Sequence, residues 1–217
     1  MQFDRIIFDW DGTLGMTLHL WLEGYKTGLA NQGYTMSDSQ IMQVIFHAPM
    51  ESTKTFPELD PAQMFRDTRD YVHDNLASIA LYDGALETLE GLAEQGIEMA
   101  LVTSSPRRLI DTALAPRRLD RYFASIIAGD EVSERKPDPE PFTATLANLG
   151  ADPATTLIVG DSHVDITAGK AAGTQTCLFT PEENRLFHDF TALQAHGPDH
   201  TITALTHLAK RAERKLP

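Results

Sequence analysis

The chain has 217 residues, of which 18 are Lys or Arg and 31 are Asp or Glu, so its formal net charge is −13 at pH 7. This length suffices for one large domain or for a domain with a smaller module, and the negative charge disfavours nucleic acid and anionic membranes as partners. The single cysteine, Cys177, excludes an intramolecular disulfide, and with no signal-like or membrane-spanning segment in the sequence we expect a cytoplasmic protein.

The first predicted element is a short buried strand at residues 5–8, which runs into the sequence DWDGT. Carboxylates at the end of an apolar run are costly unless a positive group joins them, although an Asp-Gly turn alone would also explain these residues. From residue 17 to about 81, apolar residues recur at three- and four-residue intervals, which predicts helices. We expect these helices at residues 18–29, at 38–45 behind a Ser37 cap, and at 61–79.

After residue 82 the pattern changes to alternating helices and strands. The predicted strands cover residues 97–105, 125–129, 155–162 and 174–179, with a last short strand and helix from residue 198 onward. Such alternation predicts an α/β fold, a Rossmann-like parallel sheet flanked by helices. Because the first strand belongs with this sheet, we expect a catalytic core of residues 1–15 and 83–217 and an inserted, all-helical cap of residues 16–82.

Polar side chains follow several of these strands, where the ligand site of a parallel sheet is expected. They are Asp9 and Asp11 after the first strand, Thr103 and Ser104 after the second, Lys136 after the third, and Asp161 and Asp165 after the fourth. Carboxylate oxygens are ligands that Mg²⁺ prefers, often with a substrate phosphate completing the shell. A carboxylate beside that metal and a lysine can attack phosphorus, because the cations screen the repulsion between the two anions.

In this order the residues resemble the four motifs of the haloacid dehalogenase superfamily. The motif DxDGT is matched by residues 9–13, the strand-ending Thr or Ser by Thr103, the Lys before Pro by Lys136, and the acidic fourth motif by residues 160–165. The resemblance spans the whole predicted core. It implies a phosphatase similar to phosphoglycolate phosphatases, with Mg²⁺ as cofactor and a small phosphorylated metabolite as substrate.

The resemblance also implies a role for each matched residue. Asp9 would be the nucleophile, and Asp11 would protonate the leaving group and then activate water. The metal ligands would be Asp9, the backbone carbonyl of Asp11, and Asp161, with Asp165 in the outer shell. The phosphoryl group would be bound by Thr103, Ser104 and Gly12, and Lys136 would neutralise it while fixing Asp9.

Two other functions remain open from the sequence. Sugar phosphomutases of the β-phosphoglucomutase type keep both aspartates of the first motif, and a non-catalytic phosphoacceptor or binding protein would gather similar residues. Carbon–halogen chemistry is disfavoured, because Asp11 is typically absent from that branch. The sequence does not decide between a monomer and a homodimer.

Several segments have no assigned role at this stage. The expected cap loop contains the candidate specificity residues His47, Met50, Glu51 and Lys54. Arg107 and Arg108 either reach a substrate carboxylate or are ordinary surface charges, and His163 is interpreted as a spectator. Residues 181–200 either cover the core or form an interface.

The first motif departs from the family pattern just after its leucine. Many phosphatases of this group carry an acid or a serine there, whereas this chain continues with Gly15, Met16 and Thr17. We expect Gly15 to act as a hinge between core and cap, because glycine tolerates large changes of backbone conformation.

Overall fold

The computed structural model describes residues 3–46 and 56–212, and the side chains of residues 210–212 are not described. The chain divides into two compact units, one formed by Met1–Met16 and Ala80–Pro217 and the other by Thr17–Ile79. The loop residues His47, Met50, Glu51 and Lys54 lie outside the described part of the chain.

The first unit is built on a parallel sheet. Its described residues form six strands, β1 Arg5–Phe8, β2 Glu98–Val102, β3 Phe123–Ile127, β4 Thr156–Gly160, β5 Gln175–Phe179 and β6 His200–Ile202. They lie in the order β3-β2-β1-β4-β5-β6, with every pairing parallel. Strand β1 is therefore central, and Ile7 is paired with Ala100 on one side and with Ile158 on the other. The parallel sheet predicted from the alternation is confirmed.

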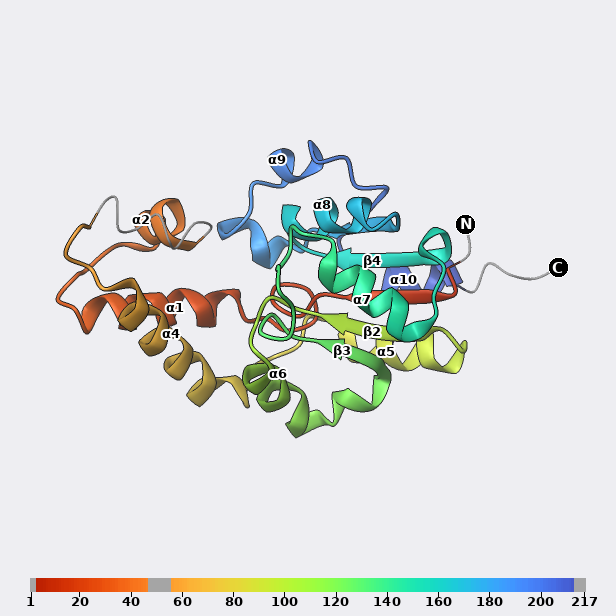
Figure 1. Ribbon diagram of the computed structural model, residues 1–217, viewed down its shortest axis with the longest axis horizontal. Coiled ribbons are helices and arrows are strands. Elements are labelled where there is room, and N and C mark those ends of the chain that lie inside the picture. The colour runs from red at the N-terminus through yellow and green to blue at the C-terminus, as the bar shows by residue number, and fades with distance from the viewer. Residues whose placement is uncertain (1–2, 47–55, 213–217) are drawn as a thin grey trace. The chain divides into compact units, whose positions relative to one another are not determined.

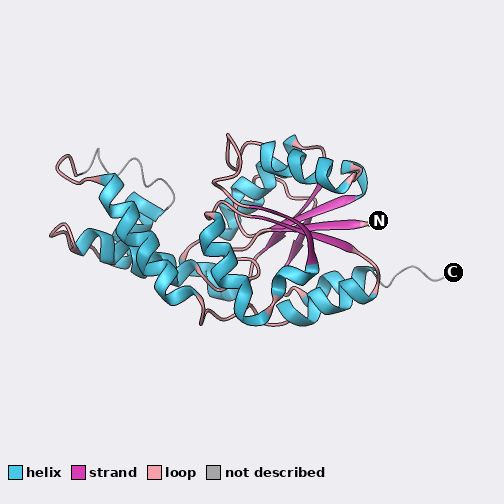
Figure 2. Cartoon of the chain, turned by 60° about the horizontal axis from the view of Figure 1, so that its bottom comes forward, coloured by secondary structure: helices cyan, strands magenta, loops and turns pink. Residues whose placement is uncertain are grey.

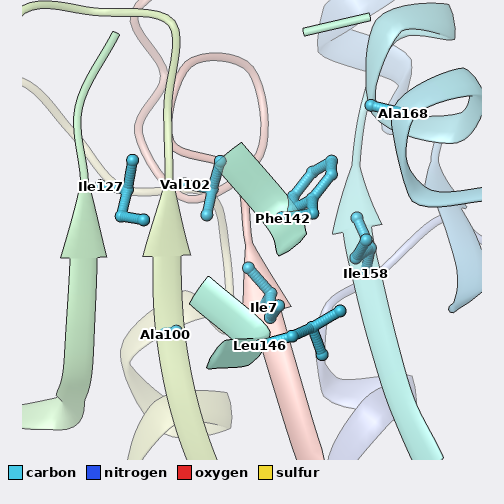
Figure 3. Packing of buried hydrophobic residues seen from close by; sticks show 8 residues of the cluster. All are labelled: Ile7, Ala100, Val102, Ile127, Phe142, Leu146, Ile158 and Ala168. Carbon is cyan, nitrogen blue, oxygen red and sulfur yellow. The ribbon is translucent and has the colours of Figure 1, made fainter. Parts of the chain in front are cut away.

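Helices cover both faces of this sheet (Figure 1, Figure 2). They are α5 Ala85–Glu94, α6 Arg107–Leu114, α7 Glu140–Leu149, α8 His163–Ala171, α9 Phe190–Gln194 and α10 Thr206–Ala212. On one face, Phe142 and Leu146 of α7 pack against Ile7, Val102 and Ile158 of the strands (Figure 3). Burying such side chains contributes roughly 1.5–3 kcal/mol each, which explains the continuous apolar runs of the central strands.

The predicted elements of this unit lie close to the expected positions. Helix α5 ends just before Gly96, whose φ of +73° is a backbone conformation that favours glycine. Cys177 is fully buried on β5, as expected for a small apolar side chain. Within the described residues, no helix is long and apolar enough to span a bilayer.

The second unit is helical throughout its described residues, 17–46 and 56–79. It contains α1 Leu18–Ala30, α2 Asp38–Ile41, a π-helical turn at Met42–Phe46, and α4 Pro61–Leu76. The predicted cap of α2 is confirmed, because the hydroxyl of Ser37 accepts from the Gln40 backbone while the Gln40 side chain accepts from the Ser37 backbone.

Helices α1 and α4 pack together closely because α1 carries small residues at the contact. A Cβ on Gly28 would lie 2.6 Å from the carbonyl oxygen of Met64 in α4, so no larger residue fits without separating the helices. The expected helix at residues 61–79 ends earlier, at Leu76, and its buried residues are Met64, Thr68, Val72 and Leu76. Phe65 is only half-buried, because a four-residue repeat that starts at Met64 faces α1.

Candidate active site

The chain turns sharply after β1, and this turn carries Asp9 and Asp11. The backbone N–H of Asp9 still donates to Val159 of β4, at 2.9 Å, so Asp9 continues the line of the strand. The next N–H groups, of Thr13, Leu14 and Gly15, all donate to the carbonyl of Trp10 at 3.0 to 3.2 Å. The aspartates therefore sit at the carboxyl end of the central strand, where the sequence placed the ligand site.

Gly12 is required in this turn for two reasons. Its φ is +79°, in the left-handed region that favours glycine, and a Cβ would lie 2.0 Å from Oδ2 of Asp161. Its N–H donates to the carbonyl of Gly15 at 3.1 Å, and its own carbonyl accepts from Asn184. The role of Gly12 in phosphate binding thus stays a prediction, whereas its role in admitting Asp161 is visible.

Lys136 joins the first and the fourth motif. Its ammonium donates to Oδ1 of Asp9 and to Oδ1 of Asp165, both at 2.7 Å, and to the carbonyl of Val102 at 3.2 Å. Only 3% of the side chain is exposed. Burial alone would lower the pKa of Lys136, but the carboxylates of Asp165 and Asp9 outweigh burial and raise it, so the lysine is charged.

Three buried carboxylates surround this lysine. Asp9, Asp161 and Asp165 each offer one oxygen, and these oxygens all lie within 4.8 Å of one another. Burial raises the pKa of Asp9 well above its ordinary value; Lys136 lowers it, and Asp165 and Asp161 raise it further. Burial also raises the pKa of Asp161. The group has more negative than positive charge, so a divalent cation with a preference for oxygen fits here.

The three carboxylates differ in the hydrogen bonds that their oxygens accept from the protein. Asp165 accepts from Lys136 on Oδ1 and from the hydroxyl and the backbone N–H of Ser162 on Oδ2, at 2.8 and 3.3 Å. Both of its oxygens are in use, which suits the predicted position outside the inner metal shell. Asp9 and Asp161 are the better candidates for direct ligands.

The side chain of Asp11 contacts the second motif and is not part of the cluster of Asp9, Asp161 and Asp165. Its Oδ2 accepts from the hydroxyl of Ser105 at 2.7 Å and from that of Thr103 at 3.4 Å. Thr103 is held in turn, because its hydroxyl accepts the backbone N–H of Ser105 at 3.0 Å. Ser104, predicted to bind phosphate, has an exposed side chain at the start of the same loop. Ser105 follows the same strand, but sequence analysis assigned it no role, and its contact with Asp11 is visible only in the structure.

The segment after β5 supplies two further residues that sequence reasoning missed. His188 contacts Oδ2 of Asp161 through Nε2 at 2.7 Å, and Asn184 donates to Gly12 at 2.9 Å and to Asp161 at 3.3 Å. Burial alone would lower the pKa of His188, but the hydrogen bond to Asp161 raises it. Of the two roles left open for residues 181–200, the structure shows that they cover the core. No motif marks either residue in the sequence.

Two further residues considered in the sequence analysis, Arg107 and His163, contact other side chains of the same unit. Arg107 donates to both carboxylate oxygens of Glu131, at 2.8 and 2.6 Å, and to the carbonyl of Ile126, so it braces the loop after β3. Arg107 is thus a partly exposed charge paired with Glu131, and its contact with a substrate carboxylate stays a prediction. The ring of His163 contacts that of His196 in a tilted arrangement, with centroids 5.3 Å apart and an interplanar angle of 36°.

Comparison with known proteins gives consistent matches along the chain. The family model for haloacid dehalogenase-like hydrolases matches residues 6–179. A protein of Anoxybacillus flavithermus named pyrophosphatase PpaX is 34% identical over 180 residues, which cover 81% of this chain and 83% of that protein. The pyrophosphatase PpaX of Bacillus mycoides is 30% identical and covers 96% of both chains. The crystal structure of a predicted phosphoglycolate phosphatase from Haemophilus somnus superposes with a TM-score of 0.84 at 26% identity, covering 98% of this chain and 99% of that one.

Proposed function

The chain belongs to the haloacid dehalogenase-like hydrolases and is a phosphatase, and on that basis we propose that it hydrolyses a small phosphorylated molecule through an aspartyl-phosphate on Asp9, with Mg²⁺ as cofactor. The observation that carries this proposal is the ion pair between Asp9 and Lys136, buried within a group of three carboxylates. A buried carboxylate that is held by a cation at a strand end is placed to act on an anionic substrate.

In the proposed first step an oxygen of Asp9 forms a bond to phosphorus, and the bond from phosphorus to the leaving oxygen breaks. Lys136 holds Asp9 in a single orientation and supplies positive charge beside the phosphoryl group. The leaving oxygen takes a proton from Asp11. Ser105 and Thr103 donate to one oxygen of Asp11 and so restrict the orientation of this carboxyl group.

In the second step water attacks the phosphorus of the phosphoenzyme, and Asp11 takes its proton. The bond between phosphorus and the Asp9 oxygen breaks, which releases inorganic phosphate and restores the carboxylate. The same residue thus serves as acid and then as base, as a half-buried carboxylate can in a two-step reaction. Thr103, Ser104 and Gly12 are proposed to hold the phosphoryl oxygens through both steps.

The proposed metal ligands are Asp9, the backbone carbonyl of Asp11, and Asp161, with Asp165 behind them. Their fit rests on the buried, clustered oxygens and on burial, which raises the pKa of both Asp9 and Asp161. When bound, Mg²⁺ supplies positive charge that offsets the repulsion between the aspartate and the phosphoryl group.

The substrate is proposed to be small. The two relatives are named pyrophosphatases, and the crystal structure is that of a predicted phosphoglycolate phosphatase. Pyrophosphate and phosphoglycolate share a terminal phosphoryl group, which is the part that the core residues are proposed to hold. We propose that residues 16–82 form a cap that selects the remainder of the molecule, that residues 1–15 and 83–217 form the catalytic core, and that the enzyme acts in the cytoplasm.

The test is phosphate release from pyrophosphate, phosphoglycolate and glucose 1-phosphate. We expect release with Mg²⁺, none after treatment with EDTA, and a loss of at least 10³-fold in kcat for Asp9→Asn. Asp120→Asn is the matched control, because Asp120 is exposed on a turn after α6.

Each contrary outcome has its own meaning. Release that survives Asp9→Asn undiminished would refute the nucleophile assignment. Conversion of glucose 1-phosphate to glucose 6-phosphate without phosphate release would show a phosphomutase. Failure to act on any of the three compounds, with or without metal, would contradict the proposed reaction.

A further inference from the structure

Two polar side chains of the segment between β5 and β6 reach Asp161, and the proposed mechanism uses neither of them. Nε2 of His188 lies 2.7 Å from Oδ2 of Asp161, and Nδ2 of Asn184 lies 3.3 Å from the same oxygen. Both are enclosed: 7% of the His188 side chain is exposed, and Asn184 is 1% exposed. Buried polar groups are normally hydrogen-bonded, and around metal sites such hydrogen bonds orient the side chains that bind the metal.

Both hydrogen bonds end on one oxygen of the carboxylate. Among the described residues, Oδ1 of Asp161 receives no hydrogen bond, while Oδ2 also lies over the backbone of Gly12. A carboxylate that is anchored through one oxygen presents the other in a fixed direction. In Asp161 the oxygen presented in this way is Oδ1, and the carboxylate of Asp161 lies in the cluster with Asp9 and Asp165.

The amide of Asn184 is itself held in one orientation. Its Oδ1 accepts the hydroxyl of Tyr82, so its Nδ2 must face Gly12 and Asp161, and it donates to the Gly12 carbonyl at 2.9 Å. Tyr82 is fixed in turn, because its backbone N–H donates to Leu14 at 3.0 Å. Asn184 therefore ties together the turn after β1 and the loop after β4.

We propose that Asn184 and His188 are positioning residues, which hold Asp161 so that its Oδ1 meets the divalent cation. This inference rests on the proposed function, in which Asp161 is a metal ligand. The family match ends at residue 179, so both residues lie outside the region that the family model matches. Losing such outer contacts costs about 10- to 100-fold in metal affinity in other proteins.

The experiment is a titration of the full chain with Mg²⁺, and isothermal titration calorimetry measures the dissociation constant. We expect the dissociation constant for Mg²⁺ to rise roughly 10- to 100-fold in His188→Ala and in Asn184→Ala. His188→Gln keeps an N–H donor near the same place and should bind Mg²⁺ within about threefold of wild type. Leu186→Ala is the matched control, because this neighbouring side chain is 49% exposed.

Activity assays add a second readout that a purely structural role would not produce. The Mg²⁺ concentration for half-maximal rate should rise in His188→Ala by the same factor as the dissociation constant. At saturating Mg²⁺ we expect kcat and the substrate KM to return to near wild-type values, because the substrate contacts are intact. A kcat that stays low at saturating Mg²⁺, with an unchanged dissociation constant, would overturn the inference.

Asp161→Asn separates the two proposals. If Asp161→Asn binds Mg²⁺ as tightly as wild type, the proposed metal site itself is wrong. If Asp161→Asn loses binding while His188→Ala and Asn184→Ala bind normally, the positioning role is refuted and the proposed function stands. Should Asn184→Ala fail to show a cooperative unfolding transition, the decision rests on His188→Ala, whose side chain lies nearer to the surface.

Discussion

Gly15 lies against the indole ring of Trp10, and a larger residue at this position has no room. A Cβ on Gly15 would stand 2.7 Å from Cε2 and 2.8 Å from Cζ2 of Trp10, whereas ordinary contacts begin at 3.4 Å. The groups would have to separate by the difference, about 0.7 Å, although Trp10 is only 1% exposed and enclosed by the core. Overpacking of this kind costs about 1–3 kcal/mol, so we predict that Gly15→Ala lowers the free energy of unfolding by about 2 kcal/mol.

The assay is urea unfolding at 25 °C, followed by far-UV circular dichroism. Because the cost comes from the indole, Gly15→Ala should cost at least 1 kcal/mol less in a Trp10→Phe background. Gly91→Ala is the control: its Cβ would lie 3.7 Å from that of Ala209, an ordinary contact, and alanine inside α5 should stabilise the protein by about 0.5–1 kcal/mol. An equal cost of Gly15→Ala in both backgrounds would refute the packing argument.

Three further perturbations test other parts of the structure. The hydrogen bond from Arg107 lowers the pKa of Glu131, so ionised Glu131 stabilises the folded state above its ordinary pKa of 4.5. Glu131→Gln should therefore cost under about 1 kcal/mol at pH 7, because solvent partly screens the ion pair. The difference in thermal stability between the variant and the wild type should vanish in acid. Gly28→Ala should lower the unfolding free energy of residues 17–79 by about 1–3 kcal/mol, measured by hydrogen exchange, because its Cβ meets the Met64 carbonyl. Phe142→Ala should cost about 3–5 kcal/mol in urea unfolding, because the ring is fully buried.

The order of strands and helices followed from local patterns in the sequence. Short apolar runs gave the six strands, the Ser37 cap placed α2, and Gly96 marked the end of α5. These signals are local because the backbone period and the caps depend on residues within about four positions. The ends of the predicted strands then placed Asp9 and Lys136 at the same edge of the sheet, where the structure shows their ion pair.

Contacts between distant irregular segments could not be obtained in this way. Ser105 reaches Asp11 across 94 residues of sequence, and Asn184 reaches Gly12 across 172. Neither serine nor asparagine in a loop carries a periodic signal, since both are equally common in turns that bind nothing. Which of them meets an aspartate is decided by how the loops pack.

The sequence by itself therefore determined the parallel sheet, the helical insertion and the family residues that follow the strands. Only the tertiary structure decided that residues 181–200 cover the core, that His188 contacts Asp161, and that Gly15 makes room for Trp10. The physical reason is that the spacing of apolar residues is a property of residues close in sequence. A hydrogen bond or a tight contact between loops forms only after the strands have brought those loops to one edge of the sheet.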